Sequence, residues 1–534
     1  MALSFSLNAV PQEVLEQIAF FSATNRFLGP PVAVAPLLRT NKRIYESLSF
    51  ENNPHLYAKI FENKFDVKTA LSRLGANQFT PITLAHELRR RCIYLKRIRA
   101  RKDSKKTAVV DSDESNIDIL QELLFYVYVM MLENEGKNMQ QLRDWARMDG
   151  WLRDFWFGSN GASNAVAVTH WDMWPANDLK SSVAMWLFWF FLNPDDYPSD
   201  GSSSWAALTT LRVYALAAHR YNLTTPSWLE FAPRLCHEIP TVVQYYGTSY
   251  KLTPPPLATP AILSFLTLVN KMSQGSECAI PLTPSNPTVV HKIDEWQCEW
   301  ERCISLGNGT LDRILTDSFK PGSIEGVWEG LFTYTEFTAY AALLAGASPN
   351  ILQKSVVVRH QQTWKLREHH LLVADASRSD SGIGLDMDNT EPLPAGDPLR
   401  SYFPTGTILK EDRDGIEVRE GEKKPALRYQ RASPGSTSCG VDSQDKGKSA
   451  VLDIIITGEG HSAWGQFNLV GRVRPCDGFI SLSKEYIDGD RGKWLYRGYL
   501  VGNANGNFAG RWRDTMSEVN SAGYEGCFAM SRRR

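Results

Sequence analysis

The sequence lacks the long apolar runs and the paired cysteines that are typical of membrane and secreted proteins. Its most apolar stretch, residues 183–192, is about half of the ~20 residues that a membrane-spanning helix needs. We interpret this stretch as a buried core helix. The eight cysteines are scattered, with no Cys-x-x-Cys pair, and no Cys/His pair at zinc-site spacing follows Cys298 and Cys303. Free thiols in a reducing compartment are therefore expected.

An excess of charge of either sign is also missing. Basic side chains number 58 and acidic ones 59, for a net charge of −1. Because no field of one sign surrounds the molecule, we expect neither a nucleic acid nor a membrane as partner. The N-terminus shows no basic region followed by an apolar run, so we expect no secretory signal and a cytoplasmic or nuclear location. A hydrophobic content of 43% indicates a folded protein.

Catalytic signatures are absent as well. The chain has no Gly-x-Ser-x-Gly elbow, no His-Glu-x-x-His helix, no phosphate-binding glycine loop and no dinucleotide fingerprint. His369 and His370, with His360 nearby, form a histidine cluster whose one neighbouring carboxylate is Glu368, and we interpret this cluster as a surface or packing feature. We predict no catalytic residue, no metal and no cofactor, and thus a protein that is not an enzyme.

The first fifty residues predict two short amphipathic helices. Pro11 suits the first position of a helix, and the following residues place one apolar stripe on it at helical spacing. A second stripe follows a Gly-Pro-Pro break. A segment of ~50 residues cannot bury enough apolar surface alone, so it is expected to pack on the next helices and to offer the rest to a partner. The stripe residues are Val14, Leu15, Ile18 and Phe21 in the first helix, and Leu37, Leu38, Ile44, Tyr45 and Leu48 in the second.

This pattern resembles the F-box, the adaptor-binding motif of Skp–cullin–F-box ubiquitin ligases. That family opens with Leu-Pro-x-Glu-Val/Leu-Leu-x-x-Ile, where this chain has Val10 and then Pro11; Thr40 stands at the position of a later cysteine. Residues 26–31 depart from the pattern, replacing a short Asp-Leu link. The resemblance implies that a Skp-type adaptor binds Pro11, Val14, Leu15, Ile18, Phe21, Leu37, Leu38, Ile44 and Tyr45. The alternative is an ordinary N-terminal helical hairpin.

The rest of the chain divides by style into three stretches. After an F-box over 1–52, residues 53–110 predict a helical linker region that carries a basic run over 89–106. This run is either a nuclear signal or nucleic-acid face, or a helix whose leucines point inward while its arginines are solvated. Residues 116–321 predict an irregular all-α domain with no fixed repeat. Strand-like alternation begins near residue 322 and continues to 534.

The last stretch predicts an antiparallel β-barrel, in a lipocalin-like style, so that the whole chain is a multidomain α+β protein. Residues 328–332 are echoed by residues 524–528, each reading aromatic, acid, glycine, any residue, phenylalanine. Matched first and last strands are what closure of a barrel requires, and a sandwich is the alternative. The predicted strands are 326–335, 415–420, 426–431, 452–457, 464–474, 478–486, 493–502, 507–515 and 523–532. The order of F-box, helices and β-module is similar to that of fungal F-box proteins.

Several of these strands put rings on one face and charges on the other. Rings of Trp464, Trp494, Tyr496 and Trp512 and the guanidinium groups of Arg472, Arg474 and Arg511 are the candidate substrate-binding groups. If Arg472 and Arg474 face a pocket with Trp464, they could hold an anionic group of a target. Alternatively, the aromatic rings fill the barrel and the arginines form a solvated exterior.

The leading hypothesis is a substrate-receptor subunit of a Skp–cullin–F-box ligase, with an adaptor, a cullin scaffold and an unknown protein target as partners. One alternative is a small-molecule-binding barrel protein; another is an F-box protein that acts outside the cullin complex. Two stretches near 375–404 and 433–448 are rich in Asp, Ser, Gly and Pro, and we predict disordered loops there, open to phosphorylation.

Overall fold

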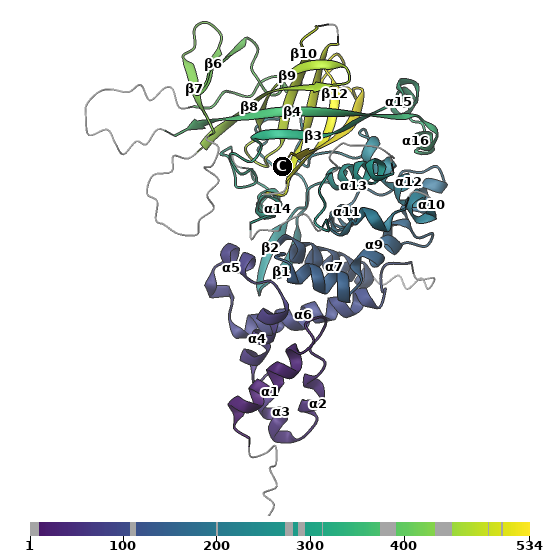
Figure 1. Ribbon diagram of the computed structural model, residues 1–534, viewed down its shortest axis with the longest axis vertical. Coiled ribbons are helices and arrows are strands. Elements are labelled where there is room, and N and C mark those ends of the chain that lie inside the picture. Colours follow the sequence, from purple (N-terminus) through teal and green to yellow (C-terminus); the bar gives the residue numbers. More distant parts are fainter. Residues whose placement is uncertain are drawn as a thin grey trace, which may run out of the picture. The chain divides into compact units, whose positions relative to one another are not determined.

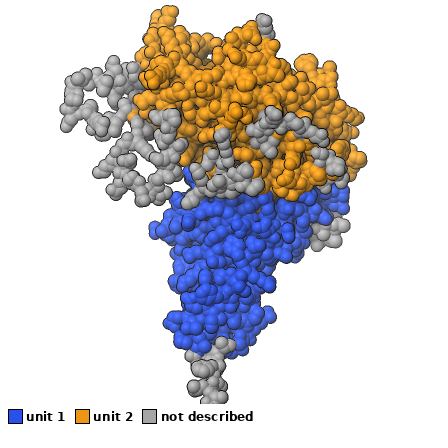
Figure 2. Space-filling view, in the orientation of Figure 1, with its two compact units in different colours: residues 1–164, 242–250, 291–294 blue, residues 165–241, 251–290, 295–534 orange. Residues whose placement is uncertain are grey.

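The computed structural model divides the chain into two compact units (Figure 1 and Figure 2). Unit 1 comprises residues 1–164, 242–250 and 291–294, and unit 2 comprises residues 165–241, 251–290 and 295–534. The division at residue 164 lies inside the stretch predicted as a single all-α domain. The structure describes residues 10–106, 114–198, 201–272, 281–286, 294–311, 313–373, 391–432, 451–489, 491–503 and 506–533.

Unit 1 is built from helices whose starts are marked in the sequence. The side chains of Asn41, Asn53 and Thr80 accept hydrogen bonds from backbone N–H groups in the first turns of α3, α4 and α6, which leaves fewer helix-end donors unpaired. Helix α1 packs on α2, α3 and α4. The helices are α1 (Gln12–Thr24), α2 (Val34–Leu38), α3 (Lys42–Leu48), α4 (Pro54–Lys64), α5 (Lys68–Leu74), α6 (Pro81–Arg99), α7 (Glu114–Leu132), α8 (Lys137–Gln140) and α9 (Met148–Phe157).

A buried arginine ties these helices together. Arg91 of α6 is fully buried and forms an ion pair with Glu133, with 2.5 Å between Nη2 and Oε1. Its guanidinium also lies over the ring of Phe61 in α4 and donates to the hydroxyl of Tyr246. The expectation that the arginines of the basic run are solvated is therefore wrong for Arg91, because Glu133, directly after α7, compensates its charge.

The segment over 26–31 is anchored inside unit 1. Gly29 has a φ of +81°, and a Cβ there would lie 2.2 Å from the indole nitrogen of Trp145, so only glycine fits. The Gly29 N–H donates to Gln141 Oε1 at 2.7 Å, and Gln141 in turn donates to the carbonyl of Phe27. Lys64 donates to the same carbonyl at 3.0 Å. These bonds link the loop after α1 to α4 and to the turn that follows α8.

Unit 2 contains one very apolar helix, α11, which packs on α13. In α11 every residue from Ser181 to Phe191 is buried, which confirms the core helix predicted at this place. Among the described helices, none is both long and apolar enough to cross a membrane. The helices are α10 (Ala165–His170), α11 (Leu179–Phe191), α12 (Ser202–Leu216), α13 (Ala258–Lys271), α14 (Gln297–Gly307), α15 (Phe337–Leu344) and α16 (Asn350–Lys354).

A two-stranded hairpin interrupts the region predicted as all-α. Strand β1 (Thr241–Tyr245) pairs with β2 (Thr248–Leu252). The turn between them needs Tyr246 and Gly247 at positive φ. The all-α prediction is wrong here, although β-branched and aromatic residues on both sides of a glycine turn are a hairpin signal.

The large sheet of unit 2 closes into an eight-stranded antiparallel barrel. Its strands follow the order β3, β13, β12, β11, β10, β9, β8, β4, and β4 pairs again with β3 (Figure 1). Three further strands extend from β4 in the order β7, β6, β5. The strands are β3 (Gly326–Thr335), β4 (Val357–Leu372), β5 (Thr407–Glu411), β6 (Gly415–Glu420), β7 (Ala426–Arg431), β8 (Val451–Ser462), β9 (Gly465–Val473), β10 (Ile480–Tyr486), β11 (Lys493–Val501), β12 (Asn507–Asp514) and β13 (Glu525–Arg532).

The barrel confirms the predicted closure and rejects the sandwich. The two echoed segments lie on neighbouring strands, with Phe332 opposite Phe528. A Cβ on Gly330 would lie 2.0 Å from the carbonyl oxygen of Ala529, and one on Gly526 would lie 2.1 Å from that of Thr333. Both glycines therefore allow β3 and β13 to approach each other closely. Strands β4 and β5 are absent from the predicted set.

The prediction of a disordered loop is wrong for residues 391–404. Leu393, Tyr402 and Phe403 are buried there, and Leu393 and Phe403 pack with Ile416 and Val418 of β6. Residues 375–390 and 433–448, for which disorder is also predicted, lie outside the described residues.

We expect Gly526→Ala to weaken the barrel. The new methyl group would overlap both the Thr333 carbonyl and the Trp512 ring, and we expect the free energy of unfolding to fall by ~3 kcal/mol. Gly421→Ala is the control, because a Cβ there meets nothing within 4 Å and only the φ of +74° opposes it, at ~1 kcal/mol. Urea unfolding followed by tryptophan fluorescence measures both. Equal stability of Gly526→Ala and the parent would contradict the close-approach argument.

Candidate functional site

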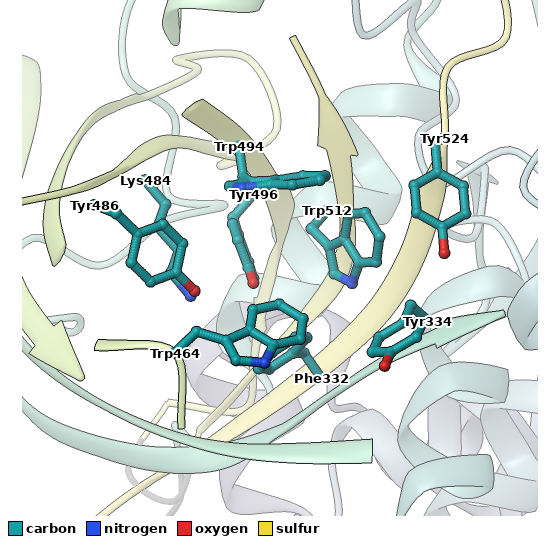
Figure 3. Close-up of a pocket in the computed structure, with 9 residues that line it drawn as sticks. All are labelled: Phe332, Tyr334, Trp464, Lys484, Tyr486, Trp494, Tyr496, Trp512 and Tyr524. Carbon is teal, nitrogen blue, oxygen red and sulfur yellow. The ribbon is translucent and has the colours of Figure 1, made fainter. Parts of the chain in front are cut away.

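An aromatic cavity lies at one end of the barrel. Its volume is about 180 Å³. The side chains that line it converge from several strands and from the turns between them, as Figure 3 shows. They stand at the ends of β3, β10 and β12, at the start of β11, and just before β9 and β13. The lining residues are Phe332, Tyr334, Trp464, Lys484, Tyr486, Trp494, Tyr496, Trp512 and Tyr524.

The turn between β8 and β9 places Trp464 over this cavity. Gly465 has a φ of +116°, a conformation that favours glycine, and the turn carries the indole inward across the mouth. The Trp464 ring lies 5.3 Å from the ring of Phe332 and 4.9 Å from that of His360. Edge-to-face and tilted ring pairs at these distances stabilise the arrangement.

The polar atoms of the cavity rings are largely engaged with the protein. Trp494 Nε1 donates to the Arg491 carbonyl at 2.9 Å, and Trp512 Nε1 donates to the Thr333 carbonyl at 2.8 Å. The hydroxyl of Tyr524 donates to the Thr335 carbonyl at 2.5 Å. The rings therefore offer mainly apolar faces and edges to the cavity.

Lys484 is the cationic group in this apolar lining. Its side chain comes from β10, the residue is 1% exposed, and its Nζ lies 3.2 Å from Gln362 Oε1. The ammonium also lies over the rings of Phe467 at 3.8 Å and Tyr486 at 4.9 Å. None of the lining residues that the structure describes is acidic. Burial without a counter-charge lowers the pKa of Lys484 from its ordinary value of 10.5 to about 7.

The structure brings four of the predicted substrate-binding residues together. Trp464, Trp494, Tyr496 and Trp512 all line the cavity. Sequence reasoning missed the other lining residues, Lys484 above all. The missed signal is the alternation of β10, in which Lys484 shares the inward face with Leu482 and Tyr486 of the barrel core.

The three predicted arginines lie on the outer face of the barrel. Arg472 pairs with Asp453 and Arg474 with Asp477, each at 2.7 Å, and all four side chains are buried. Arg511 donates to the carbonyls of Tyr214, Ala215 and Tyr221. The expectation that Arg472 and Arg474 share the side of Trp464 fails, because the turn at Gly465 redirects the indole. The alternative of a solvated exterior also fails, since covering segments of unit 2 bury these groups.

The N-terminal helices present a second candidate surface. Val14, Ile18 and Phe21 recur at helical spacing along one face of α1 and are 46%, 39% and 65% exposed. Tyr45 of α3 is 51% exposed. The other predicted adaptor-binding residues divide: Pro11 is exposed, Leu37 and Leu38 are partly buried, and Leu15 and Ile44 are buried.

The histidine cluster lies in β4. His369 is buried, with its Nε2 2.9 Å from Thr457 Oγ1, and burial lowers its pKa to about 4. His370 Nε2 lies 2.7 Å from Glu368 Oε1. Among the described residues, no group of three or more His, Cys, Asp or Glu is arranged to hold a metal ion. His369 is thus packed inside the sheet, and His370 is paired with a carboxylate of its own strand.

The buried Lys484 predicts a pH dependence of stability. The folded protein releases this proton near pH 7, whereas the unfolded chain keeps it up to about pH 10.5. In that window the unfolded chain binds more protons, so rising pH stabilises the fold by up to ~1.4 kcal/mol per pH unit. Lys484→Met removes this effect. We therefore expect its stability advantage over the parent to be largest below pH 7 and to shrink as the pH rises.

Urea unfolding across this pH range checks the expectation. Lys493→Met is the matched control, because Lys493 is exposed and pairs with Glu485 on the neighbouring strand. Its stability difference from the parent should stay level over the window. A pH-independent difference for Lys484→Met would show that Lys484 is not buried as a free amine.

Comparison with known proteins assigns no function to this chain, so a functional proposal depends on the geometry of the structure. No family model matches the chain, and searches of curated proteins and of solved structures find no significant match.

Proposed function

We propose that this protein is the substrate-receptor subunit of a Skp–cullin–F-box ubiquitin ligase. Helices α1 to α3 bind a Skp-type adaptor, and the mouth of the barrel binds a protein target. The observation that carries the proposal is the division of apolar residues in the N-terminal helices, where some build the core of unit 1 and others are exposed at helical spacing.

The exposed apolar face of α1 supports adaptor binding. Leu15 and Ala19 on the same helix are buried and already hold α1 against the rest of unit 1. Val14, Ile18 and Phe21 are therefore not needed for that contact. Neighbouring large apolar side chains that remain exposed mark interaction surfaces. An amphipathic helix offering residues at i, i+4 and i+7 is a common docking element.

The rim of the cavity supports target binding. Phe337, Val356, Ile487 and Met516 are 68%, 62%, 60% and 93% exposed. Each lies within a few residues of a strand end at the cavity side of the barrel. The ring of Phe337 lies 5.7 Å from that of the cavity residue Tyr524. An apolar rim around an aromatic depression suits a protein partner that inserts an apolar side chain.

This role requires no catalytic group in the chain. In a cullin ligase the bound ubiquitin-conjugating enzyme carries the thioester, and the receptor raises the local concentration of a target lysine beside it. An F-box protein that acts outside the cullin complex would use the same helices, and ubiquitylation of a bound target distinguishes the two roles.

The second candidate function is that of a small-molecule-binding barrel protein. The aromatic cavity with Lys484 at the barrel mouth is the observation that favours it. This function and adaptor binding use different surfaces, so both can belong to one molecule.

We expect Phe21→Asp to abolish co-purification with a Skp-type adaptor while the protein stays folded. The substitution introduces a charge on an exposed apolar position, and loss of one such anchor weakens an interface by ~2 kcal/mol or more. Leu15→Asp is a poorer test, because Leu15 is buried and the variant would unfold. Met516→Asp places the same charge at an exposed position on the barrel, and this variant should bind the adaptor normally. If the folded parent fails to bind any Skp-type adaptor, the ligase assignment is wrong.

The reciprocal experiment tests the target surface. In a reconstituted ligase, Met516→Asp and Phe337→Asp should lower the ubiquitylation of a captured target, while Phe21→Asp removes it by releasing the adaptor. Binding of the target to the receptor alone, measured by pull-down, should fall only for the two rim variants. Target binding that is unaffected by both rim substitutions would place the substrate surface elsewhere.

A further inference from the structure

Lys484 is a buried cation for which the described protein supplies no counter-charge. The described groups around its Nζ are the Gln362 amide and the rings of Phe332, Phe467, Tyr486 and Tyr496. A buried amine ordinarily has an acid as partner, since an isolated charge is expensive to bury. Other buried cations of unit 2, such as Arg472 and Arg474, do have one. The ammonium of Lys484 can donate three hydrogen bonds, so it keeps capacity for a further acceptor.

The aromatic lining does not make this a cation site. Rings that surround an empty space attract quaternary or methylated ammonium groups. Here the cation is already present, supplied by Lys484, and a second one in the same cavity would be repelled. An anion has the opposite effect, because it neutralises the ammonium while its apolar part contacts the rings.

The size of the cavity limits the occupant. An apolar cavity of about 150 Å³ in another protein accommodates benzene. At about 180 Å³ this one holds a single ring with a short substituent. One ammonium balances one negative charge, which fits a carboxylate better than a phosphate, whose extra charge would need further donors.

We propose that the barrel-mouth cavity binds a small aromatic carboxylate, with its ring among Trp464, Trp494 and Trp512 and its carboxylate paired with the Lys484 ammonium. This site goes beyond the proposed capture of a protein target and does not depend on adaptor binding. It requires only the closed barrel and the inward position of Lys484. Three tryptophans of the lining provide an intrinsic fluorescence signal for occupancy.

Phenylacetate is a suitable probe because it is one ring with a short acidic arm. In titrations of the full-length protein near pH 6, we expect saturable changes in tryptophan fluorescence with a Kd of about 1 mM or tighter. Phenylacetamide has nearly the same shape without the charge, and we expect it to bind at least ~10-fold more weakly. Lys484→Met and Lys484→Gln should both weaken phenylacetate binding by a similar factor. Lys493→Met, on the neighbouring strand, should bind like the parent.

The affinity should also fall as the pH rises from about 6 to about 9, because Lys484 loses its charge in this range. Other titratable groups near the cavity do not produce this trend. Tyr486, Tyr496 and Tyr524 have raised pKa values and stay neutral, and His360, whose pKa is lowered, stays uncharged. The guanidinium of Arg491 lies over the Tyr486 ring, 5.9 Å from its centroid.

Three results would overturn the proposal. The first is the absence of saturable binding of phenylacetate at about 10 mM. The second is equal affinity for phenylacetate and phenylacetamide. The third is unchanged affinity in both Lys484 variants. Adaptor binding by the same protein samples is measured in parallel, so that failure of this site and failure of the ligase assignment are told apart.

Discussion

The pairing of β3 on both of its edges is the constraint on which the rest of unit 2 depends. Because β3 hydrogen-bonds to β13 on one side and to β4 on the other, the eight strands have no free edge. Closure brings Phe332 near the start of the barrel and Tyr524 near the chain end to one cavity. Alternation along each strand then decides which rings point inward. The cavity is thus a product of closure and not of any local motif.

Much of the barrel could be predicted from the sequence, because alternation and glycine turns are local signals. The echo between residues 328–332 and 524–528 even indicated closure, since identical steric needs recur on paired strands. Strand β4 was not predicted, because polar residues such as Gln362 and Glu368 interrupt its alternation of apolar and polar side chains. The hairpin β1–β2 was not predicted, because the segments before and after it in the sequence are helical. Both cases show tertiary context overriding a local pattern.

The candidate site was less predictable than the fold. The alternation along the strands predicted that aromatic side chains share one face, and four of the predicted residues line the cavity. The prediction for Arg472, Arg474 and Arg511 was wrong, because a strand pattern shows which face a side chain lies on but not which segments cover that face. Asp453 and Asp477 are buried beside Arg472 and Arg474 and form ion pairs with them. Losing one partner of such a pair costs ~3–5 kcal/mol, because the other charge is left buried and unpaired, so Arg472 and Arg474 are unsuited to transient recognition. Lys484, unlike Arg472 and Arg474, has no described acid as partner.

The anchored loop after α1 has a consequence for how the N-terminal helices can be handled. Gly29 is seated against Trp145 and Gln141, and Lys64 holds the carbonyls of Arg26 and Phe27. Groups more than a hundred positions further along the sequence thus help to fix this loop in place. The first fifty residues are therefore not expected to keep their structure when they are transferred alone to another protein. Fused to a foreign protein, they would leave behind Lys64, Gln141 and Trp145, the groups that hold the loop after α1.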